Sequence, residues 1–363
     1  GFGLYCMSML SLLKQSREAP PEGVNPIAIS LISNFTDGIF ASLLCGAARE
    51  RDFFCKVQTF GYRAHHQVLC GALAENISVN GRVVWIDLNA FRKQELHDAE
   101  TLRSFISHIE EFVSVHTEPT IFVLSPTSTG STHAYMETKD PFFSVYYVFT
   151  TEIRRIAQKF SHITVLDSTR LAMRLGNGYV WDMRGLYAFD MPFSQDFLAL
   201  VAIECAALFA SQAGRVKKCL VLDLDNTLWG GVLGEDGVSG IQLGPDYPGN
   251  AFVAFQENIR LLASRGVLLA INSKNNKDDV LLALSSHPHM ILRENDFACI
   301  FASWEDKVNN LRFIAEELGI GTDALVFLDD DPVQRNWVKE QLPEVSVPDW
   351  SMPPEEYSRA FLE

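Results

Sequence analysis

Residues 220–228 read Leu-Val-Leu-Asp223-Leu-Asp225-Asn-Thr227-Leu, an apolar strand pattern that ends in two aspartates spaced two positions apart. Side chains two positions apart in an extended chain point in the same direction. We therefore expect both carboxylates at the carboxyl end of a buried strand, the edge at which doubly wound sheets bind ligands. Carboxylate oxygens are hard ligands that suit Mg²⁺. Alone, the pattern is a hypothesis, because two solvated aspartates in a turn would look the same in sequence.

Three further polar segments follow in an order that supports a phosphoryl-transfer site. They are Ser273-Lys274-Asn275 after the apolar run 267–271, Lys307 at the start of a helix, and Asp329-Asp330 after the apolar run 324–328. Because strand ends of a parallel sheet meet at one edge, these groups should converge with the first aspartate pair.

Each residue type at this edge suits one task in phosphoryl chemistry. We expect Asp223 to act as a carboxylate nucleophile and Asp225 as general acid and base. Ser273 and Lys307 would bind the non-bridging phosphate oxygens, with Lys307 offsetting the carboxylate charge. The predicted Mg²⁺ ligands are Asp223, Asp225 through its backbone carbonyl, Asp329 and Asp330.

Around these motifs the chain alternates apolar runs with helical patterns, in two series. Strands are expected at 27–32, 83–86, 120–124 and 163–166 in the first series, and at 219–224, 267–271, 299–302 and 324–328 in the second. Such alternation predicts parallel sheets covered on both faces. The predicted fold class is α/β with two doubly wound parallel-sheet domains. We expect an N-terminal helix and linker at 1–24, a first domain at 25–214 and a second at 215–363, with the boundary at Gln212-Ala-Gly-Arg215.

Composition excludes several classes of protein. The 363 residues are 47% hydrophobic and carry a net charge of −15, enough to build a large core but the wrong sign for a nucleic-acid binder. No apolar run reaches the roughly 20 residues that span a bilayer; the best candidate, 197–210, is short and contains Glu204. The apolar start 1–13 lacks a basic leader, so we expect a terminal helix. Seven scattered cysteines without a CxxC pair predict a reducing cytoplasm.

The four motifs together resemble the haloacid dehalogenase (HAD) superfamily, and the stretch Lys218-Cys-Leu-Val-Leu-Asp-Leu-Asp-Asn-Thr-Leu-Trp-Gly-Gly-Val-Leu-Gly-Glu-Asp-Gly237 resembles the narrower FkbH-like proteins of polyketide pathways. Ser273-Lys-Asn-Asn276, Trp304-Glu-Asp-Lys307 and Phe327-Leu-Asp-Asp-Asp-Pro332 extend the resemblance over nearly all of 215–350. It implies an enzyme that loads a glyceryl group from D-1,3-bisphosphoglycerate onto the phosphopantetheine thiol of an acyl carrier protein, with Mg²⁺-dependent dephosphorylation.

The resemblance also implies a set of substrate contacts. Trp229-Gly230-Gly231 matches the family's flap, which would close over the substrate, although a β-turn with a packing tryptophan would read the same way. The other expected contacts are Thr227, Asn272, Lys274 and Asn275. For Asn272 the alternative is that its amide satisfies a neighbouring backbone group.

Asn272 is also a departure from the family. Many FkbH-like proteins have a cysteine immediately before the serine of the second motif, and an amide cannot form a thioester. Cys219 begins its strand about 13 Å from Asp223, and Cys299 likewise begins a strand. We therefore expect no glyceryl adduct on the enzyme and direct attack by the carrier thiol.

The first half resembles SGNH hydrolases more loosely, at Ser33-Asn-Phe-Thr36 and Pro192-Phe-Ser194. It lacks a Gly-Asp-Ser turn, and Asp182 is followed three positions later by Gly185 where a hydrolase has histidine. No Ser-His-Asp relay is therefore expected. His65, His66 and His133 are interpreted as ordinary polar residues, because they lack metal-ligand spacing.

Two other functions are compatible with the sequence: a free-standing small-molecule phosphatase of the same fold, and a non-catalytic scaffold for carrier proteins. Dependence on a carrier protein separates the first from glyceryl loading. Residues 1–214 carry 17 basic and 21 acidic residues, whereas 215–363 carry 13 and 24. An acidic carrier should therefore dock on the first half or on the boundary cluster Arg215, Lys217 and Lys218.

Overall fold

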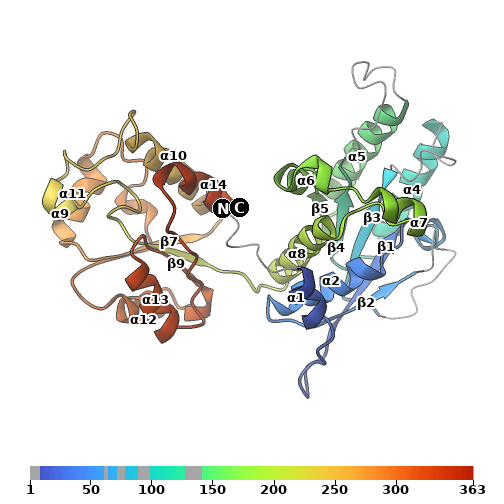
Figure 1. The fold of residues 1–363 in the computed structure, drawn as a ribbon, viewed down its shortest axis with the longest axis horizontal. Coiled ribbons are helices and arrows are strands. Elements are labelled where there is room, and N and C mark those ends of the chain that lie inside the picture. Colours follow the sequence, from blue (N-terminus) through green and yellow to red (C-terminus); the bar gives the residue numbers. More distant parts are fainter. Residues whose placement is uncertain (1–8, 61–63, 72–77, 89–98, 127–140, 363) are drawn as a thin grey trace. The chain divides into compact units, whose positions relative to one another are not determined.

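The computed structural model describes residues 9–60, 64–71, 78–88, 99–126 and 141–362 (Figure 1). They form two compact units, which meet in sequence between Arg215 and Val216. The expected helix at 1–13 lies partly outside the described residues; the helix there is α1, Met9–Gln15. His133 also lies outside them.

The first unit contains a five-stranded parallel sheet in the order β2-β1-β3-β4-β5. Its strands are β1 Ile27–Ser33, β2 Cys55–Thr59, β3 Gly81–Ile86, β4 Thr120–Leu124 and β5 Ile163–Asp167. Its other helices are α2 Gly38–Arg49, α3 His65–Leu69, α4 Ala99–Val115, α5 Pro141–Lys159, α6 Thr169–Leu175, α7 Met183–Phe189 and α8 Gln195–Gln212, with a 3₁₀ turn at Asn177–Tyr179.

Alternation along β3 divides the core of the first unit between the two faces of the sheet. Trp85 packs in the cluster formed with α2 and α8, whereas Val84 and Ile86 pack in the cluster formed with α4 and α5. Successive side chains of a strand point to opposite faces, so a strand buried on both sides must be apolar throughout. This explains why continuous apolar runs, rather than alternating ones, marked the strands.

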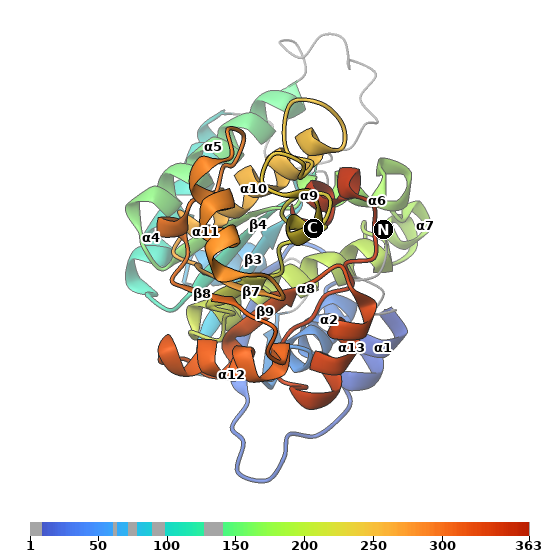
Figure 2. The same ribbon diagram turned by 90° about the vertical axis from the view of Figure 1, so that its left-hand side faces the viewer.

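The second unit contains a four-stranded parallel sheet in the order β8-β7-β6-β9. Its strands are β6 Cys219–Leu222, β7 Leu268–Ser273, β8 Cys299–Ala302 and β9 Leu325–Leu328. Its helices are α9 Leu233–Asp236, α10 Gly249–Ala263, α11 Lys277–Ser286, α12 Lys307–Glu317, α13 Pro332–Gln341 and α14 Tyr357–Leu362, with 3₁₀ turns at Glu294–Asp296, Thr322–Ala324 and Pro354–Glu356. Figure 2 shows α12 and α13 on one side of this sheet and α10 and α11 on the other.

The predicted α/β class with two doubly wound parallel sheets is confirmed. Several details differ from the sequence prediction. β6 ends at Leu222, two residues short of the expected end at 224, so Asp223 and Asp225 follow the strand. β2 was missed, because Cys-Lys-Val-Gln-Thr is a half-exposed edge strand with little apolar content. β7 continues two residues beyond the apolar run, so Asn272 and Ser273 belong to the strand itself.

Helix α8 is the one helix in the described ranges that is long and apolar enough to cross a membrane. It lies in the core of the first unit, where Phe197, Val201 and Cys205 are fully buried. Core helices of soluble proteins have the same composition. The six cysteines in the described part of the chain are free thiols.

Candidate active site

The site lies where β6, β7 and β9 end. β6 is paired with β7 on one side and β9 on the other, and Asp223, Ser273 and Asp329 stand at or just beyond the last residues of these strands. The Asp223 N–H donates to the Leu328 carbonyl at 2.9 Å, so the ladder between β6 and β9 extends to the first aspartate. Strand pairing therefore fixes the backbone that carries the carboxylates.

A lysine links two of these carboxylates. Lys307 Nζ lies 3.0 Å from Asp223 Oδ1 and 2.6 Å from Asp329 Oδ2. The Lys307 side chain is 3% exposed and that of Asp329 is fully buried. A buried charge is costly unless it is paired, so each of the three groups depends on the others.

Asp330 completes an acidic cluster at this edge. Asp223, Asp329 and Asp330 each offer a carboxylate oxygen, and these atoms lie within 4.8 Å of one another. Arg335, at the start of α13, donates from Nη1 to the carbonyls of Asp329 (2.7 Å) and Asp330 (2.6 Å) and so fixes the loop that carries them. Sequence analysis missed Arg335, since a single arginine in a helix gives no signal of such a contact.

Burial shifts the titration of the cluster. It raises the pKa of Asp223 to about 6, against the opposing charge of Lys307. Burial, and then the charge of Asp329, raise the pKa of Asp330 to about 6. Burial alone would lower the pKa of Lys307, but the charges of Asp223 and Asp329 raise it above its ordinary value. Lys307 is thus held as a cation between Asp223 and Asp329.

Asp225 is oriented by three donors. Its Oδ1 accepts from Trp229 Nε1 and from the Leu233 N–H, both at 3.0 Å, and its Oδ2 accepts from Asn275 Nδ2 at 2.9 Å. Each carboxylate oxygen can accept two hydrogen bonds, so Oδ2 keeps one position open. The side chain is therefore fixed in direction and still able to exchange a proton.

Two of the expected substrate contacts, Trp229 and Asn275, make hydrogen bonds within the protein. Trp229 is fully buried and holds Asp225, so it does not act as an open flap. This burial matches the alternative interpretation of a β-turn with a packing tryptophan. Asn275 also contacts protein groups: besides Asp225, it donates to Ser273 Oγ at 3.1 Å.

Asn272 likewise serves the fold. It is fully buried, its Nδ2 donates to the Lys307 carbonyl at 2.9 Å, and its Oδ1 accepts from Asn310 Nδ2 at 3.0 Å. The expected hydrogen bond to substrate is thus replaced by a tie between β7 and the start of α12. This tie places the backbone of Lys307.

The remaining expected contacts fall in three environments. Lys274 is exposed. Thr227 is fully buried, and within the described ranges its Oγ1 has no hydrogen-bond partner. Gly230 and Gly231 form the turn after β6: Gly230 exchanges backbone hydrogen bonds with Gln242, and Gly231 adopts a φ of +91°, which favours glycine.

A cavity of about 310 Å³ adjoins the acidic cluster. Among its lining residues are Asn226, Gly230, Phe252, Asp330, Trp350 and Tyr357. A Cβ at Gly230 would come within 2.7 Å of Gln242 Oε1 and 3.0 Å of the Phe252 ring, so a larger residue there would require these side chains to shift where the turn borders the cavity. Apart from Gly230 and Asp330, sequence analysis did not find these residues, which come from loops and helices far apart in the chain.

The first unit offers a different arrangement at its own strand end. The Ser33 hydroxyl is shared between Asp37 Oδ2 (2.8 Å) and the Phe35 carbonyl (3.0 Å). Asp182 caps α7 by accepting from the Gly185 N–H at 2.8 Å. A Cβ at residue 185 would lie 2.7 Å from the Met191 carbonyl oxygen, so a histidine there requires the backbone to move.

Comparisons with known proteins place the fold. No family profile and no curated protein matches the chain. Among solved structures, the chain is similar to the N-terminal part of BF1531 from Bacteroides fragilis, described as containing a phosphatase domain complexed with Mg, at 25% identity and a TM-score of 0.88 over 98% of this chain and 97% of that one. The two proteins share their fold, so this chain has the architecture of a protein with a phosphatase domain.

Two other likenesses cover single units. A lipase/acylhydrolase from Enterococcus faecalis matches at 15% identity and a TM-score of 0.37, over 51% of this chain and 96% of that one. A HAD family enzyme from Bacteroides thetaiotaomicron, in complex with magnesium and inorganic phosphate, matches at 16% identity and a TM-score of 0.26, over 37% and 97%. Neither likeness is strong enough to support a conclusion about function.

Proposed function

We propose that the second unit is a Mg²⁺-dependent phosphatase domain of the HAD type, and that it loads a glyceryl group from D-1,3-bisphosphoglycerate onto the thiol of a phosphopantetheinylated acyl carrier protein. The observation that carries the first part is the buried Asp223–Lys307–Asp329 cluster beside an Asp225 held by three donors. The solved neighbour with a phosphatase domain complexed with Mg supports it.

The donor set fits Mg²⁺. Asp223, Asp329 and Asp330 supply hard carboxylate oxygens within 4.8 Å of one another, and the Asp225 carbonyl is the fourth candidate ligand. Mg²⁺ would neutralise charge on the phosphate and hold Asp223 ionised at neutral pH.

Each side chain of the site then has its own role in the reaction. The Asp223 carboxylate attacks the phosphorus of the 3-phosphate, the bond from phosphorus to the glyceryl oxygen breaks, and Asp225 donates its proton to that oxygen. Asp225 next takes a proton from water, which attacks the aspartyl phosphate and releases inorganic phosphate. Lys307 and Ser273 hold the non-bridging oxygens throughout. The cavity beside Asp330 would receive the organic part of the substrate.

Glyceryl transfer is the finer part of the proposal. It rests on the resemblance of the four motifs. The carrier thiol attacks the carbonyl carbon of the acyl phosphate, the bond from that carbon to the phosphate oxygen breaks, and phosphate leaves with the proton of the thiol. The two cysteines of residues 216–362 are poorly suited to intercept the acyl group. Cys219 and Cys299 are buried at the starts of β6 and β8, where burial raises the pKa of Cys219 to about 12 and that of Cys299 to about 11.

Carrier docking on Arg215, Lys217 and Lys218, or on the basic residues of the first half, remains part of the proposal, as does a cytoplasmic location. Lys217 Nζ donates to the Asp323 carbonyl at 2.6 Å and Arg215 Nη1 to the Asp52 carbonyl at 2.5 Å. Both side chains are exposed, so their charges are available to an acidic partner.

The test is to incubate the protein with Mg²⁺, 1,3-bisphosphoglycerate and a phosphopantetheinylated carrier protein, and to weigh both proteins by mass spectrometry. We expect glyceryl on the carrier and none on the enzyme. If phosphate is released without the carrier and no carrier is acylated, the protein is a small-molecule phosphatase and the glyceryl-transfer part of the proposal is wrong. A glyceryl adduct on an enzyme cysteine would refute direct transfer, and absence of any Mg²⁺-dependent turnover would favour the scaffold.

A further inference from the structure

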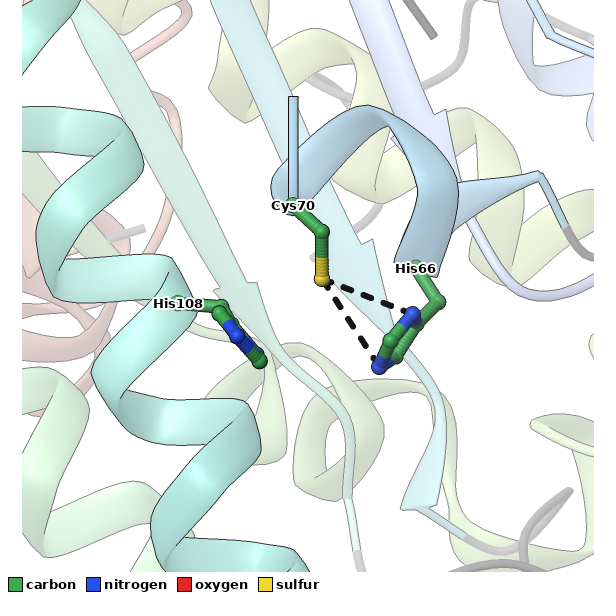
Figure 3. A group of neighbouring side chains, drawn as sticks. All are labelled: His66, Cys70 and His108. Atoms are coloured by element: carbon green, nitrogen blue, oxygen red, sulfur yellow. Dashed lines mark hydrogen bonds between the residues drawn. The ribbon is translucent and has the colours of Figure 1, made fainter. Parts of the chain in front are cut away.

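The first unit holds a cysteine and two histidines close together, away from its strand end (Figure 3). His66 and Cys70 come from α3 and the residue that follows it, four positions apart, and His108 comes from the middle of α4. Figure 3 shows the three side chains converging in the space between these two helices. Residues four apart on a helical turn share one face, so α3 presents two potential ligands to α4.

The distances match a shared metal ion. Cys70 Sγ lies 3.5 Å from His66 Nδ1 and 3.8 Å from its Nε2, and one ligand atom from each of the three residues lies within 4.8 Å of the others. On a tetrahedral Zn²⁺ with bonds of about 2.3 Å to sulfur and 2.0–2.1 Å to nitrogen, sulfur and nitrogen are about 3.6 Å apart. The thiol and the His66 ring therefore already have the separation that one zinc ion demands.

Two further observations favour convergence on a ligand over chance proximity. His108 Nδ1 is shielded from solvent and, in the described part of the chain, has no hydrogen-bond partner. A buried ring nitrogen without a partner is costly, and a metal would satisfy it. The His66 ring is also held in place, stacked on Phe105 of α4 with the planes 13° apart.

We propose that His66, Cys70 and His108 form a site for a divalent transition metal of the zinc class, separate from the acidic cluster of the second unit. A thiolate and two imidazoles are soft to borderline ligands, which select Zn²⁺ over Mg²⁺. Three protein ligands leave the fourth position to water or to Glu111, which follows His108 by one helical turn on α4. The ion would fasten the short helix α3 to α4.

Under this proposal His66 is a metal ligand, where the sequence analysis interpreted it as an ordinary polar residue. The spacing His66-x₃-Cys70 was visible in the sequence, but the third ligand lies 38 positions further on and only the packing of α3 on α4 brings it near.

Cobalt is the probe, because a thiolate bound to Co²⁺ gives a charge-transfer band that carboxylate ligands do not give. The full chain is freed of metal with a chelator and titrated with Co²⁺. We expect a near-ultraviolet sulfur-to-cobalt band and visible bands of a tetrahedral ion, saturating at one equivalent and abolished by Zn²⁺. Asp223 and its neighbours, as oxygen ligands, cannot produce the sulfur band.

Variants assign the ligands. Cys70→Ser should remove the sulfur band, and His66→Ala or His108→Ala should weaken Co²⁺ binding by more than the roughly 10- to 100-fold that loss of an outer partner costs. His108→Cys keeps a ligand and should restore binding with a stronger sulfur band. Cys45→Ser, a half-buried thiol on α2, is the matched control and should bind as the parent does.

Circular dichroism of each variant without metal separates loss of a ligand from loss of fold. A parent protein without the sulfur band would overturn the proposal and leave a thiol–imidazole hydrogen bond. So would a band that survives in Cys70→Ser, or one that Cys45→Ser removes and Cys70→Ser does not.

Discussion

In each unit a central strand leads into polar residues at the carboxyl edge of a parallel sheet, but those side chains have different partners in the two units. In the second unit, Asp223 follows β6 and faces a buried lysine that is shared with Asp329. In the first unit, Ser33 ends β1 and its hydroxyl is already committed to Asp37 and Phe35. The carboxyl edge of a parallel sheet can thus carry an active site. Whether a strand-end side chain is available for catalysis depends on the hydrogen bonds and ion pairs that it makes.

The same contrast extends to the residues that hold these groups. Asp225 is oriented by Trp229 in the second unit, whereas the indole N–H of Trp85 in the first unit donates to Ser125 Oγ at 2.9 Å. Both tryptophans are fully buried. One supports a proposed proton donor and the other supports the core, so matched substitutions in the two units can separate catalysis from stability.

The largest expected effect is that of Asp223→Asn. The amide keeps the shape of the side chain but removes the nucleophile, so phosphate release should fall by a factor of about 10⁴ or more. Release is measured under saturating Mg²⁺ with a phosphate ester, and Ser33→Ala in the first unit is the matched control. Normal turnover by Asp223→Asn would contradict its role as the nucleophile. An equal loss of activity in Ser33→Ala would show that the first unit takes part in phosphate release.

Asp225→Asn should have a smaller and substrate-dependent effect. An alkoxide leaving group needs a proton and should lose about 10²–10⁴ in rate, whereas a carboxylate leaving group needs little protonation. We therefore expect a larger loss with a phosphate ester than with an acyl phosphate, measured as kcat on both substrates. Equal losses would show that Asp225 does not act as the general acid.

The sequence predicted the core elements of both units and the edge at which the polar groups meet. Continuous apolar runs mark strands buried on both faces, and strand pairing then brings Asp223, Ser273 and Asp329 together. Lys307 was also placed at the start of its helix. These features follow from local pattern and from the geometry of a parallel sheet.

The sequence did not predict how the side chains that hold the site residues in place are oriented. Asn272 and Asn275 have the residue type of a substrate ligand, yet both are used within the protein, because the nearest donors and acceptors come from α12 and from Asp225. The positions of Arg335 and of the cavity residue Tyr357 follow from how α13 and α14 pack against the loops of the site, which local sequence does not reveal. His66 and Cys70 gain a third neighbour only through packing with α4.

Trp229→Phe tests the support of Asp225 without opening the core. The ring still packs, but Asp225 Oδ1 loses one of its two donors, a charge-assisted hydrogen bond worth about 1.5–3 kcal/mol. We expect kcat for a phosphate ester to fall about tenfold, because Asp225 is held less firmly towards the leaving oxygen. Trp85→Phe in the first unit is the control and should lower stability while leaving kcat unchanged.

The smallest effect should be an opposite response of the two units to acid when divalent cations are removed. In the second unit the folded-state pKa values of Asp223 and Asp330, about 6, lie above the ordinary value of 3.8. The folded state therefore binds more protons in this window, and stability should rise as the pH falls from about 6 to 4. In the first unit Arg155 and Lys159 lower the pKa of Glu110 to about 2, so that stability should be lost as the pH falls from about 4.5 to 2.

Hydrogen exchange measured by mass spectrometry can read the two units separately, after correction for the intrinsic dependence of exchange on pH. In chelator, protection of β6 and β9 should increase between pH 6 and 4.5, while protection of α4 and α5 should not. Mg²⁺ competes with protons for Asp223 and Asp330, so it should remove the increase in the second unit and leave the first unit unchanged. If the chelated protein instead loses protection in β6 and β9 over this window, burial does not raise the pKa values of Asp223 and Asp330. The contrast with Glu110 of the first unit would then be wrong.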